Sequence, residues 1–276
     1  MIGLPRSTYY RRSVVRKAPS ADRAVVERDD ALRAAITAVR QTHPAYGYRR
    51  VTHALRRTGL LVNHKRVQRV MRTLLAPPMP RRRSWVVAEP DAVTGSWYPN
   101  LRADCTPTGT DLLWVADMTY LHVGAEAAFL AVLLDAWSRK VIGYAVGPLL
   151  DARLPLAVLD AALDTRRPAP ACIHHSDRGS QYASRRYRER LAATGLRDSM
   201  SRAGNPYDNA HVESFMKTIK HEEIYLRSYQ SMADLMAQLP VYLEQTYNGT
   251  RLHSALDYVT PDEYERAVHP SPMEVK

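Results

Sequence analysis

The chain has 276 residues, of which 45% are hydrophobic, and a formal net charge of +11. This length allows one large or two modest domains with a sizeable core. No run of about 18 apolar residues could span a membrane, and the basic N-terminal segment lacks the apolar stretch of a signal peptide. The only cysteines, Cys105 and Cys172, have no CxxC spacing, which argues against a disulfide framework or a zinc knuckle. These features predict a cytoplasmic protein with no membrane partner.

The positive charge is concentrated in the first third of the chain. Residues 1–92 contain 20 Lys and Arg against 6 Asp and Glu, whereas residues 93–276 contain 19 against 22. A basic region of this density is typical of proteins that bind the phosphate backbone of nucleic acids. A codon bias toward arginine would also enrich basic residues, but it does not explain their confinement to one region.

Residues 1–75 predict a small helical domain. Helices are expected at about Asp22–Gln41, Tyr48–Arg57 and Asn63–Leu75, from apolar residues at helical spacing and from capping residues. The last two helices, joined by a Gly-containing turn, form a candidate helix-turn-helix. The second of them offers four basic side chains to DNA: Lys65, Arg66, Arg69 and Arg72. A packing or dimerisation role is the alternative, because any small helical bundle shows the same apolar spacing.

A linker is predicted over residues 76–96. It contains four prolines and three consecutive arginines, Arg81, Arg82 and Arg83, and the prolines prevent a continuous helix. We expect these three arginines to contact DNA.

Residues 97–268 predict an α/β domain, followed by a short tail at 269–276. The pattern changes from helical spacing to alternation at the start of this region, and the expected order is three strands, helix, strand, helix, strand, helix. A further helix is expected at about 232–248, and no helix or strand is assigned after it. The expected strands lie at about residues 112–123, 127–135, 140–146, 171–175 and 197–200.

Three acidic residues are candidates for binding metal ions in an active site. Asp117 interrupts an apolar strand, Asp177 ends the short strand CIHHSD, and Glu213 lies on the helix that NPYDN introduces. A carboxylate among apolar residues costs several kcal/mol unless it is paired or bound to a metal. Mg²⁺ prefers oxygen ligands, and a pair of such ions can clamp both oxygens of a phosphoryl displacement. Singly, an edge-strand aspartate, a turn aspartate and a helical Glu–Lys pair would each have an ordinary structural explanation.

The helix of Glu213 carries basic residues on the same face. Lys217 is at i+4 and Lys220 at i+7, so we expect both ammonium groups to hold phosphates beside the carboxylate. Three further DNA contacts are expected in the adjoining loops: Arg178, Tyr207 and Asn209.

Other polar residues suit structural roles. Asp135 is expected to stabilise a turn, and His174 and His175 to be packed beside the second aspartate. Arg251 and His253 are assigned no role beyond support of the active site, while Asp208 or Asn209 can cap the catalytic helix.

Six stretches, from about Pro44 to Tyr264, closely resemble one family. They occur in the family's order and spacing: GYRRVTHALRRTGLLVNHKRVQRVMR, WVADMTYL, LLDAWSRKVIGYAV, HHSDRGSQY, MSRAGNPYDNAHVESFMKTIKHE and YNGTRLHSALDYVTPDEYE. The chain is identified as a member of the DDE transposases of the insertion-sequence-three family, which have a retroviral-integrase-type core.

The resemblance implies a fold, a site and partners. The fold would be a ribonuclease-H-like core with a mixed five-stranded sheet, preceded by a small all-α helix-turn-helix-like domain. Asp117, Asp177 and Glu213 would be the catalytic and metal-binding residues, with two Mg²⁺ as cofactor and Mn²⁺ as a substitute. Lys220 occupies the place of a family residue that touches the terminal bases of the element.

The implied function is DNA transposition by metal-dependent 3′-end cleavage and strand transfer. The partners would be double-stranded DNA, as terminal inverted repeats and target, and further copies of the chain as a homo-oligomer. The start MIGLPRSTYY is similar to the region just after an upstream reading-frame product, which is a further expected partner.

Two other functions are compatible with parts of the sequence. A DNA-binding regulator or inhibitor of transposition would use the basic region alone, but the intact acidic triad argues against it. A structure-selective nuclease of ribonuclease-H type would share the metal site, but the basic N-terminal region and the LHSAL block disfavour it.

Overall fold

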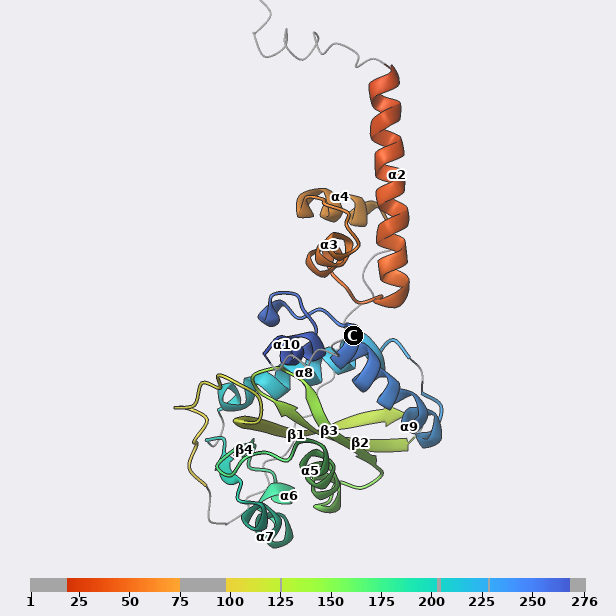
Figure 1. Cartoon of the computed structure of the whole chain (residues 1–276). Helices are drawn as coiled ribbons and strands as arrows, with labels where there is room; N and C mark the ends of the chain where they lie inside the picture. The colour runs from red at the N-terminus through yellow and green to blue at the C-terminus, as the bar shows by residue number, and fades with distance from the viewer. Residues whose placement is uncertain (1–18, 75–97, 125, 203–204, 228, 269–276) are drawn as a thin grey trace, which may run out of the picture. The chain divides into compact units, whose positions relative to one another are not determined.

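The computed structural model describes most of two compact units, residues 1–82 and 83–276 (Figure 1). The described residues are 19–74, 98–124, 126–202, 205–227 and 229–268. The expected linker at 76–96, with Arg81, Arg82 and Arg83, and the expected tail at 269–276 lie outside them.

The N-terminal unit contains the three expected helices, α2 (Pro19–Thr42), α3 (Tyr48–Arg57) and α4 (His64–Leu74). Asn63 caps α4, because its Oδ1 accepts the backbone N–H of Lys65 at 2.9 Å. The turn between α3 and α4 passes through Gly59 at φ 86°, a left-handed conformation that glycine adopts without steric cost. Apolar side chains from all three helices form its core: Leu32, Ile36, Val51, Leu55, Val67, Val70 and Met71.

The C-terminal unit is built on one mixed sheet. Its five strands are β1 (Leu113–Val123), β2 (Glu126–Asp135), β3 (Val141–Gly147), β4 (Ile173–Ser176) and β5 (Arg197–Met200). They lie in the order β3-β2-β1-β4-β5. β2 pairs antiparallel with β1 and β3, whereas β4 pairs parallel with β1 and β5. The expected ribonuclease-H-like arrangement of five strands is confirmed.

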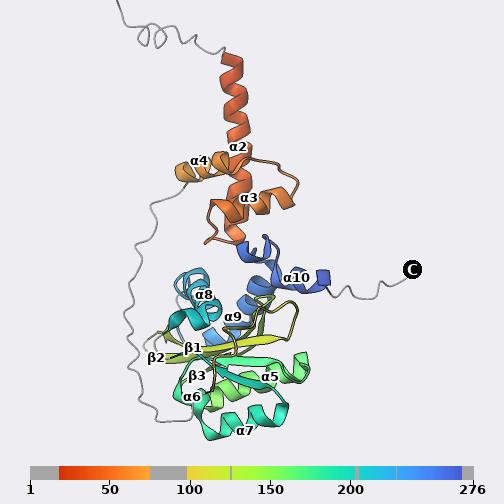
Figure 2. The same ribbon diagram turned by 90° about the vertical axis from the view of Figure 1, so that its left-hand side faces the viewer.

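Helices cover both faces of this sheet (Figures 1 and 2). On one face lie α5 (Arg153–Arg166), α6 (Ser180–Ala183) and α7 (Arg185–Thr194), and on the other α8 (Ala210–Ile219) and α9 (Met232–Val241). Successive side chains of a strand point to opposite faces. Accordingly, Val115 packs in the cluster that contains Phe215 of α8, and Ala116 in the cluster that contains Leu159 of α5. The same alternation turns Asp117 toward the face that α8 covers.

The structure differs from the expected elements mainly near the chain's C-terminal third. The helix that carries Glu213 begins with a 3-10 turn, Pro206–Asn209, and continues after α8 as a π-helical turn, Lys220–Ile224. The helix expected at 232–248 is α9 followed by a π-helical segment, Tyr242–Thr250, and Pro240 lies just before the change. Proline removes a backbone donor and crowds the preceding turn, which accounts for altered hydrogen bonding there. A last helix, α10 (Pro261–Val268), was not expected.

Among the described residues, no helix is long and apolar enough to cross a membrane.

Candidate active site

The sheet topology places two of the three predicted carboxylates on neighbouring strands. Asp117 lies in the middle of β1, and Asp177 directly follows β4. The parallel register pairs Val115 with His175, each two residues before an aspartate, and the repulsion that Asp117 experiences from Asp177 reflects their proximity. Glu213 lies in the first turn of α8, which packs against β1. The three residues therefore come from three elements that meet at one place.

Asp117 is partly accessible, yet closely surrounded by protein atoms and by like charge. Burial, followed by repulsion from Asp177 and Glu213, raises its pKa to about 8. Its Oδ1 accepts the backbone N–H of Met118 at 2.7 Å, which together with the nearby Lys220 ammonium opposes that rise. A bound cation would offset the repulsion from the two other carboxylates, and it would therefore lower this pKa and favour the ionised form of Asp117.

Asp177 is oriented by the loop that follows β4. Its Oδ1 accepts the backbone N–H of Gly179 at 3.0 Å. Burial raises the pKa of Asp177, and this hydrogen bond opposes the rise. A Cβ on Gly179 would lie 3.0 Å from the same oxygen. The loop thus needs a residue without a side chain to hold the carboxylate in this position.

Glu213 shares its helix with both predicted lysines. The Lys217 ammonium lies 3.8 Å from the Glu213 carboxylate, at the i+4 position, and its side chain is 76% exposed. Lys220 is half-buried, and burial lowers its pKa while the Asp117 carboxylate raises it. Lys217 is thus open to solvent, whereas Lys220 lies within electrostatic reach of Asp117.

The donor set at this place fits a hard divalent cation. Three carboxylates supply only oxygen ligands, which Mg²⁺ prefers, and their mutual repulsion would be relieved by positive charge. The fit is one of ligand chemistry and charge, because in the described part of the chain no three His, Cys, Asp or Glu side chains, these carboxylates included, lie closely enough together to enclose an ion.

The loop before α8 is held by a buried aspartate. The carboxylate of Asp208 accepts the backbone N–H and the guanidinium of Arg202 at 2.9–3.0 Å, and the amide of Asn205 at 3.2 Å. The guanidinium of Arg202 is the main reason that the pKa of Asp208 falls to about 2. The backbone carbonyl of Asp208 accepts a hydrogen bond from Arg102 Nη1 at 2.7 Å. Arg102 was missed from the sequence because no motif surrounds it.

Asn209 follows Asp208 and is only 5% exposed. Its Nδ2 donates to the carbonyl of Ala116 at 3.1 Å, and its side chain makes no cap bond to α8. The structure thus places inside the fold a residue for which the sequence predicted DNA contact. The side chain of Tyr207, another predicted contact, lies outside the described structure. Arg178 donates its Nε to the Ser201 carbonyl at 2.8 Å.

The two histidines before Asp177 are completely buried. His175 hydrogen-bonds Ser199 through Nδ1 at 2.8 Å and Ser201 through Nε2 at 3.1 Å, which ties β4 to β5. His174 bonds the hydroxyl of Tyr187 at 2.9 Å. Burial lowers both pKa values, to about 3 for His174 and about 4 for His175, so both are neutral at ordinary pH and serve packing.

Asp135 has the turn-stabilising contacts that the sequence predicts. Its Oδ1 accepts the backbone N–H groups of Trp137 and Ser138, and its Oδ2 that of Asp111.

Two of the four predicted DNA-contacting residues on α4 are paired within the N-terminal unit. Arg66 and Arg69 both reach Asp29 of α2, at 2.8 and 3.1 Å. Lys65 and Arg72 are exposed. The pairing holds α4 against α2, an interaction that helical spacing could not reveal.

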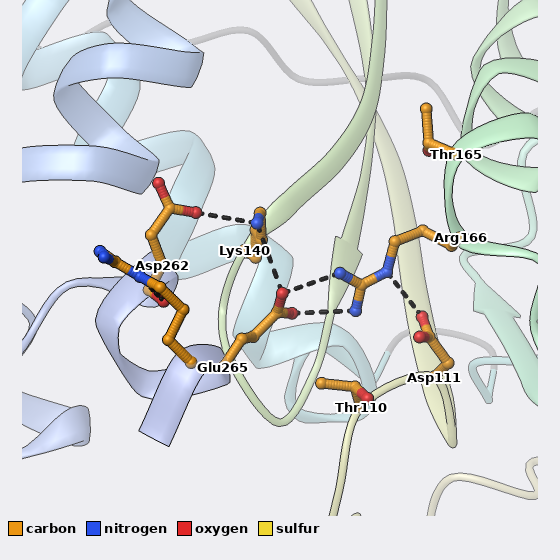
Figure 3. Close-up of a pocket in the computed structure, with 8 residues that line it drawn as sticks. Thr110, Asp111, Lys140, Thr165, Arg166, Asp262 and Glu265 are labelled. Carbon is orange, nitrogen blue, oxygen red and sulfur yellow. Dashed lines mark hydrogen bonds and ion pairs between the residues drawn. The ribbon is translucent and has the colours of Figure 1, made fainter. Parts of the chain in front are cut away.

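A separate polar cavity of about 530 Å³ lies beside the start of β1, and none of the three carboxylates lines it. Arg166 binds Asp111 at 2.9 Å and Glu265 at 2.8 Å, while Lys140 binds Asp262 at 2.8 Å (Figure 3). In each pair the positive and negative side chains neutralise each other, and the pairs attach α10 to neighbouring elements. We therefore assign this cavity a structural role.

Comparison with known proteins agrees with this architecture. Residues 107–206 match the integrase core domain family, residues 194–261 match a second integrase core domain family, and residues 27–83 match the HTH-like domain family. The cryo-EM structure of a simian T-cell lymphotropic virus intasome in complex with PP2A regulatory subunit B56 gamma is similar in fold, with a TM-score of 0.50 and 18% identity. The match covers 82% of this chain and 72% of that one.

Curated relatives extend over nearly the whole chain. The insertion element IS600 uncharacterized 31 kDa protein of Shigella sonnei is 33% identical over 276 residues, which cover 98% of this chain and 97% of that protein. The transposase for insertion sequence element IS904 of Lactococcus lactis is 36% identical over 222 residues, covering 80% and 87%. The putative transposase InsK for insertion sequence element IS150 of Escherichia coli is 33% identical over 270 residues, covering 96% and 91%. The chain therefore belongs to the insertion-sequence-three family of transposases, with an integrase-type core preceded in sequence by a helix-turn-helix-like domain.

Proposed function

We propose that this transposase frees the 3′ ends of an insertion sequence by hydrolysis and joins them to another DNA strand by transesterification. The observation that carries the proposal is the convergence of Asp117, Asp177 and Glu213, where the last two raise the pKa of the first. Both reactions are displacements at phosphorus, so one site can serve them in succession. The DNA-binding regulator without activity is not favoured, since the curated relatives include transposases.

Asp117, Asp177 and Glu213 are the catalytic residues in this proposal, and they would hold two Mg²⁺, or Mn²⁺ in their place. When bound, such a pair of ions activates the attacking oxygen and stabilises the leaving oxygen. The chain contributes orientation: the Gly179 amide holds Asp177, β1 holds Asp117 next to it, and α8 presents Glu213 from the other side.

Basic side chains beside the carboxylates would bind the DNA backbone. Lys217 is well exposed next to Glu213, so it can reach a phosphate without desolvation. Lys220 lies deeper and would meet the terminal nucleotides near Asp117. The remaining proposed DNA contacts are Arg178, Tyr207, Lys65, Arg66, Arg69, Arg72, Arg81, Arg82 and Arg83. For Arg66 and Arg69 this requires sharing with Asp29 or release from it.

The substrates would be double-stranded terminal inverted repeats and a target duplex. Because two ends react, we propose a homo-oligomer on DNA, with the upstream reading-frame product as a further partner. The proposed domain limits are 1–75, 76–96, 97–268 and 269–276.

The test uses the purified chain and labelled duplex from the terminal repeat of its own element, with Mg²⁺ or Mn²⁺. Wild type should cleave the 3′ end and join it to a second duplex, and Asp177→Asn should lose both activities, by about 10³-fold or more, because it removes a ligand charge. Cleavage without joining would favour the nuclease. Salt-sensitive binding without any metal-dependent cleavage would contradict the proposal for the chain alone.

A further inference from the structure

The amide of Asn209 connects the strand that carries Asp117 to the helix that carries Glu213. Asn209 immediately precedes α8, at the position where an asparagine usually caps a helix through its side chain. Here the side chain makes no cap bond, is 5% exposed, and donates Nδ2 to the Ala116 carbonyl at 3.1 Å. The side chain at the N-cap position of α8 thus bonds to strand β1 of the sheet instead of to its own helix.

The carbonyl that accepts this bond lies where β1 and β4 separate. The Leu112 carbonyl accepts the backbone N–H of Ile173 at 3.0 Å, on the edge of β1 that faces β4. Carbonyls of alternate residues share an edge, so the Ala116 carbonyl points the same way. The register between the strands ends at Val115 and His175, one residue earlier. Asn209 therefore satisfies the first β1 carbonyl beyond the end of this ladder.

Both ends of the hydrogen bond adjoin a carboxylate. Ala116 directly precedes Asp117, and Asn209 is the residue just before α8, whose first turn contains Glu213. The Oδ1 of Asn209 is buried with no hydrogen-bond partner in the described structure, so the bond to Ala116 is what fixes this amide. Because this bond is the one hydrogen bond of the Asn209 side chain in the described structure, it determines how the start of α8 is attached to β1.

We propose that Asn209 is a positioning residue, which links the strand that carries Asp117 to the helix that carries Glu213 and so sets how these two carboxylates can approach a shared divalent cation. This inference rests on the proposed function of the acidic site. It also departs from the sequence-based prediction of a DNA contact, because a side chain that is 5% exposed offers little surface to a phosphate.

The rest of the junction can fold without this bond. Asp208, the preceding residue, is held by Arg202 through its carboxylate and by Arg102 through its carbonyl. Loss of the Asn209 amide should therefore loosen the spacing of the two carboxylates without releasing the loop.

The chain offers a matched control in Asn248. It is also 5% exposed and donates Nδ2 to a strand carbonyl, that of Val141 at 2.9 Å, while its Oδ1 accepts the Val141 N–H at 2.9 Å. Val141 starts β3, which is separated from β1 by β2. Asn248→Ala should cost at least as much stability as Asn209→Ala, because it breaks two bonds instead of one.

The experiment measures Mn²⁺ binding to the DNA-free full chain by electron paramagnetic resonance, and the Mg²⁺ dependence of 3′-end cleavage at saturating DNA. Asn209→Ala and the similarly sized Asn209→Leu should weaken Mn²⁺ binding and raise the Mg²⁺ concentration for half-maximal rate by about 10- to 100-fold, the usual effect of losing a residue that orients a metal ligand. DNA affinity in EDTA should stay within about twofold of wild type, since the basic side chains that bind phosphates are unchanged. Asn248→Ala should leave both metal readouts unchanged.

Three outcomes would overturn the inference. Unchanged Mn²⁺ binding in both Asn209 variants would show that the amide does not set the metal site. Weakened DNA affinity with normal metal dependence would identify a DNA contact instead. Absence of Mn²⁺ binding and of cleavage in wild type would contradict the proposed function itself, and this role with it.

Discussion

Gly179 shows how one residue orients a carboxylate. Its backbone N–H donates to Asp177 Oδ1 at 3.0 Å, and a Cβ at this position would meet the same oxygen at 3.0 Å. Its backbone, at φ −61° and ψ 141°, suits any residue. The requirement for glycine is therefore one of space beside the carboxylate.

We expect Gly179→Ala to lower the rate of 3′-end cleavage by up to about 10-fold, because the Asp177 carboxylate must move by a few tenths of an ångström, less than the ~1 Å misplacement that can cost about 100-fold. The free energy of unfolding should be unchanged or higher by about 0.5 kcal/mol, because alanine restricts the unfolded chain. Gly47→Ala is the control, since a Cβ there has nothing within 4 Å. Equal cleavage rates for the Gly179 variant and wild type would contradict this account.

Asp198 is a buried carboxyl whose ionisation opposes folding. Both of its oxygens are buried without a hydrogen bond of good geometry, and burial raises its pKa to about 7. A folded-state pKa above the unfolded value of about 3.9 means that the folded protein binds the proton more tightly. Stability from this group is complete below pH 4 and is lost as the pH rises toward and through 7.

Asp198→Asn should remove this pH dependence. Between pH 5 and pH 8 the stability of the variant relative to wild type should increase by about 1–2 kcal/mol, a figure that allows for partial exposure of the carboxyl. Urea unfolding at both pH values measures this difference. If the difference in unfolding free energy between the two proteins were the same at pH 5 and pH 8, burial would not raise the pKa of Asp198.

At the scale of elements, an ion pair joins the segment after Tyr242–Thr250 to the π-helical turn that continues α8, the helix that carries Glu213. Arg251 is 3% exposed and follows the π-helical segment Tyr242–Thr250. It donates Nε and Nη2 to the two carboxylate oxygens of Glu222, each at 2.6 Å. Glu222 lies in the π-helical turn just after α8, so the pair supports the helix that carries Glu213. This gives a structural reason for the RLHSAL block.

Arg251→Met should lower the free energy of unfolding by about 3–5 kcal/mol, because it leaves the Glu222 carboxylate without its main partner. Adding Glu222→Leu should recover part of that loss, since the uncompensated charge is then removed. Urea unfolding of both single variants and the double variant measures this coupling. Additive effects would mean that the two residues stabilise the chain independently.

At the scale of the whole molecule, the excess of basic residues and the three carboxylates proposed as catalytic lie in different parts of the chain. Residues 1–92 carry the excess of basic residues, whereas residues 93–276 contain 19 basic and 22 acidic residues. Both large clusters of the sheet's core, and all three proposed catalytic residues, lie within residues 98–268.

A fragment of residues 98–276 should therefore fold cooperatively and bind Mn²⁺, yet bind DNA more weakly than the full chain. The slope of log affinity against log salt concentration should become shallower, by about 0.9 for each phosphate that the fragment no longer neutralises. Circular dichroism and fluorescence anisotropy across a salt series test both parts. An unchanged slope would mean that the N-terminal unit does not contact the DNA backbone.

Much of the architecture follows from local pattern. Helical spacing and capping residues were sufficient for α2, α3 and α4, and apolar patterning with turn residues for the first three strands, while β4 was predicted as a short buried strand; these signals act over a few residues. The resemblance to transposases was confirmed by a putative transposase that matches 96% of this chain and a transposase that matches 80% of it. The catalytic and metal-binding roles of Asp117, Asp177 and Glu213 stay a prediction.

Interactions between distant residues depended on packing. The parallel pairing of β1 with β4 brings together the ends of two segments that carry Asp117 and Asp177, although these aspartates are 60 positions apart in the numbering. Packing also buries Asn209, for which the sequence predicted DNA contact, and its amide bonds to the Ala116 carbonyl. In the N-terminal unit, packing pairs Arg66 and Arg69 with Asp29. A residue's type and spacing specify what its side chain can bond, but its actual partner depends on which elements fold against it.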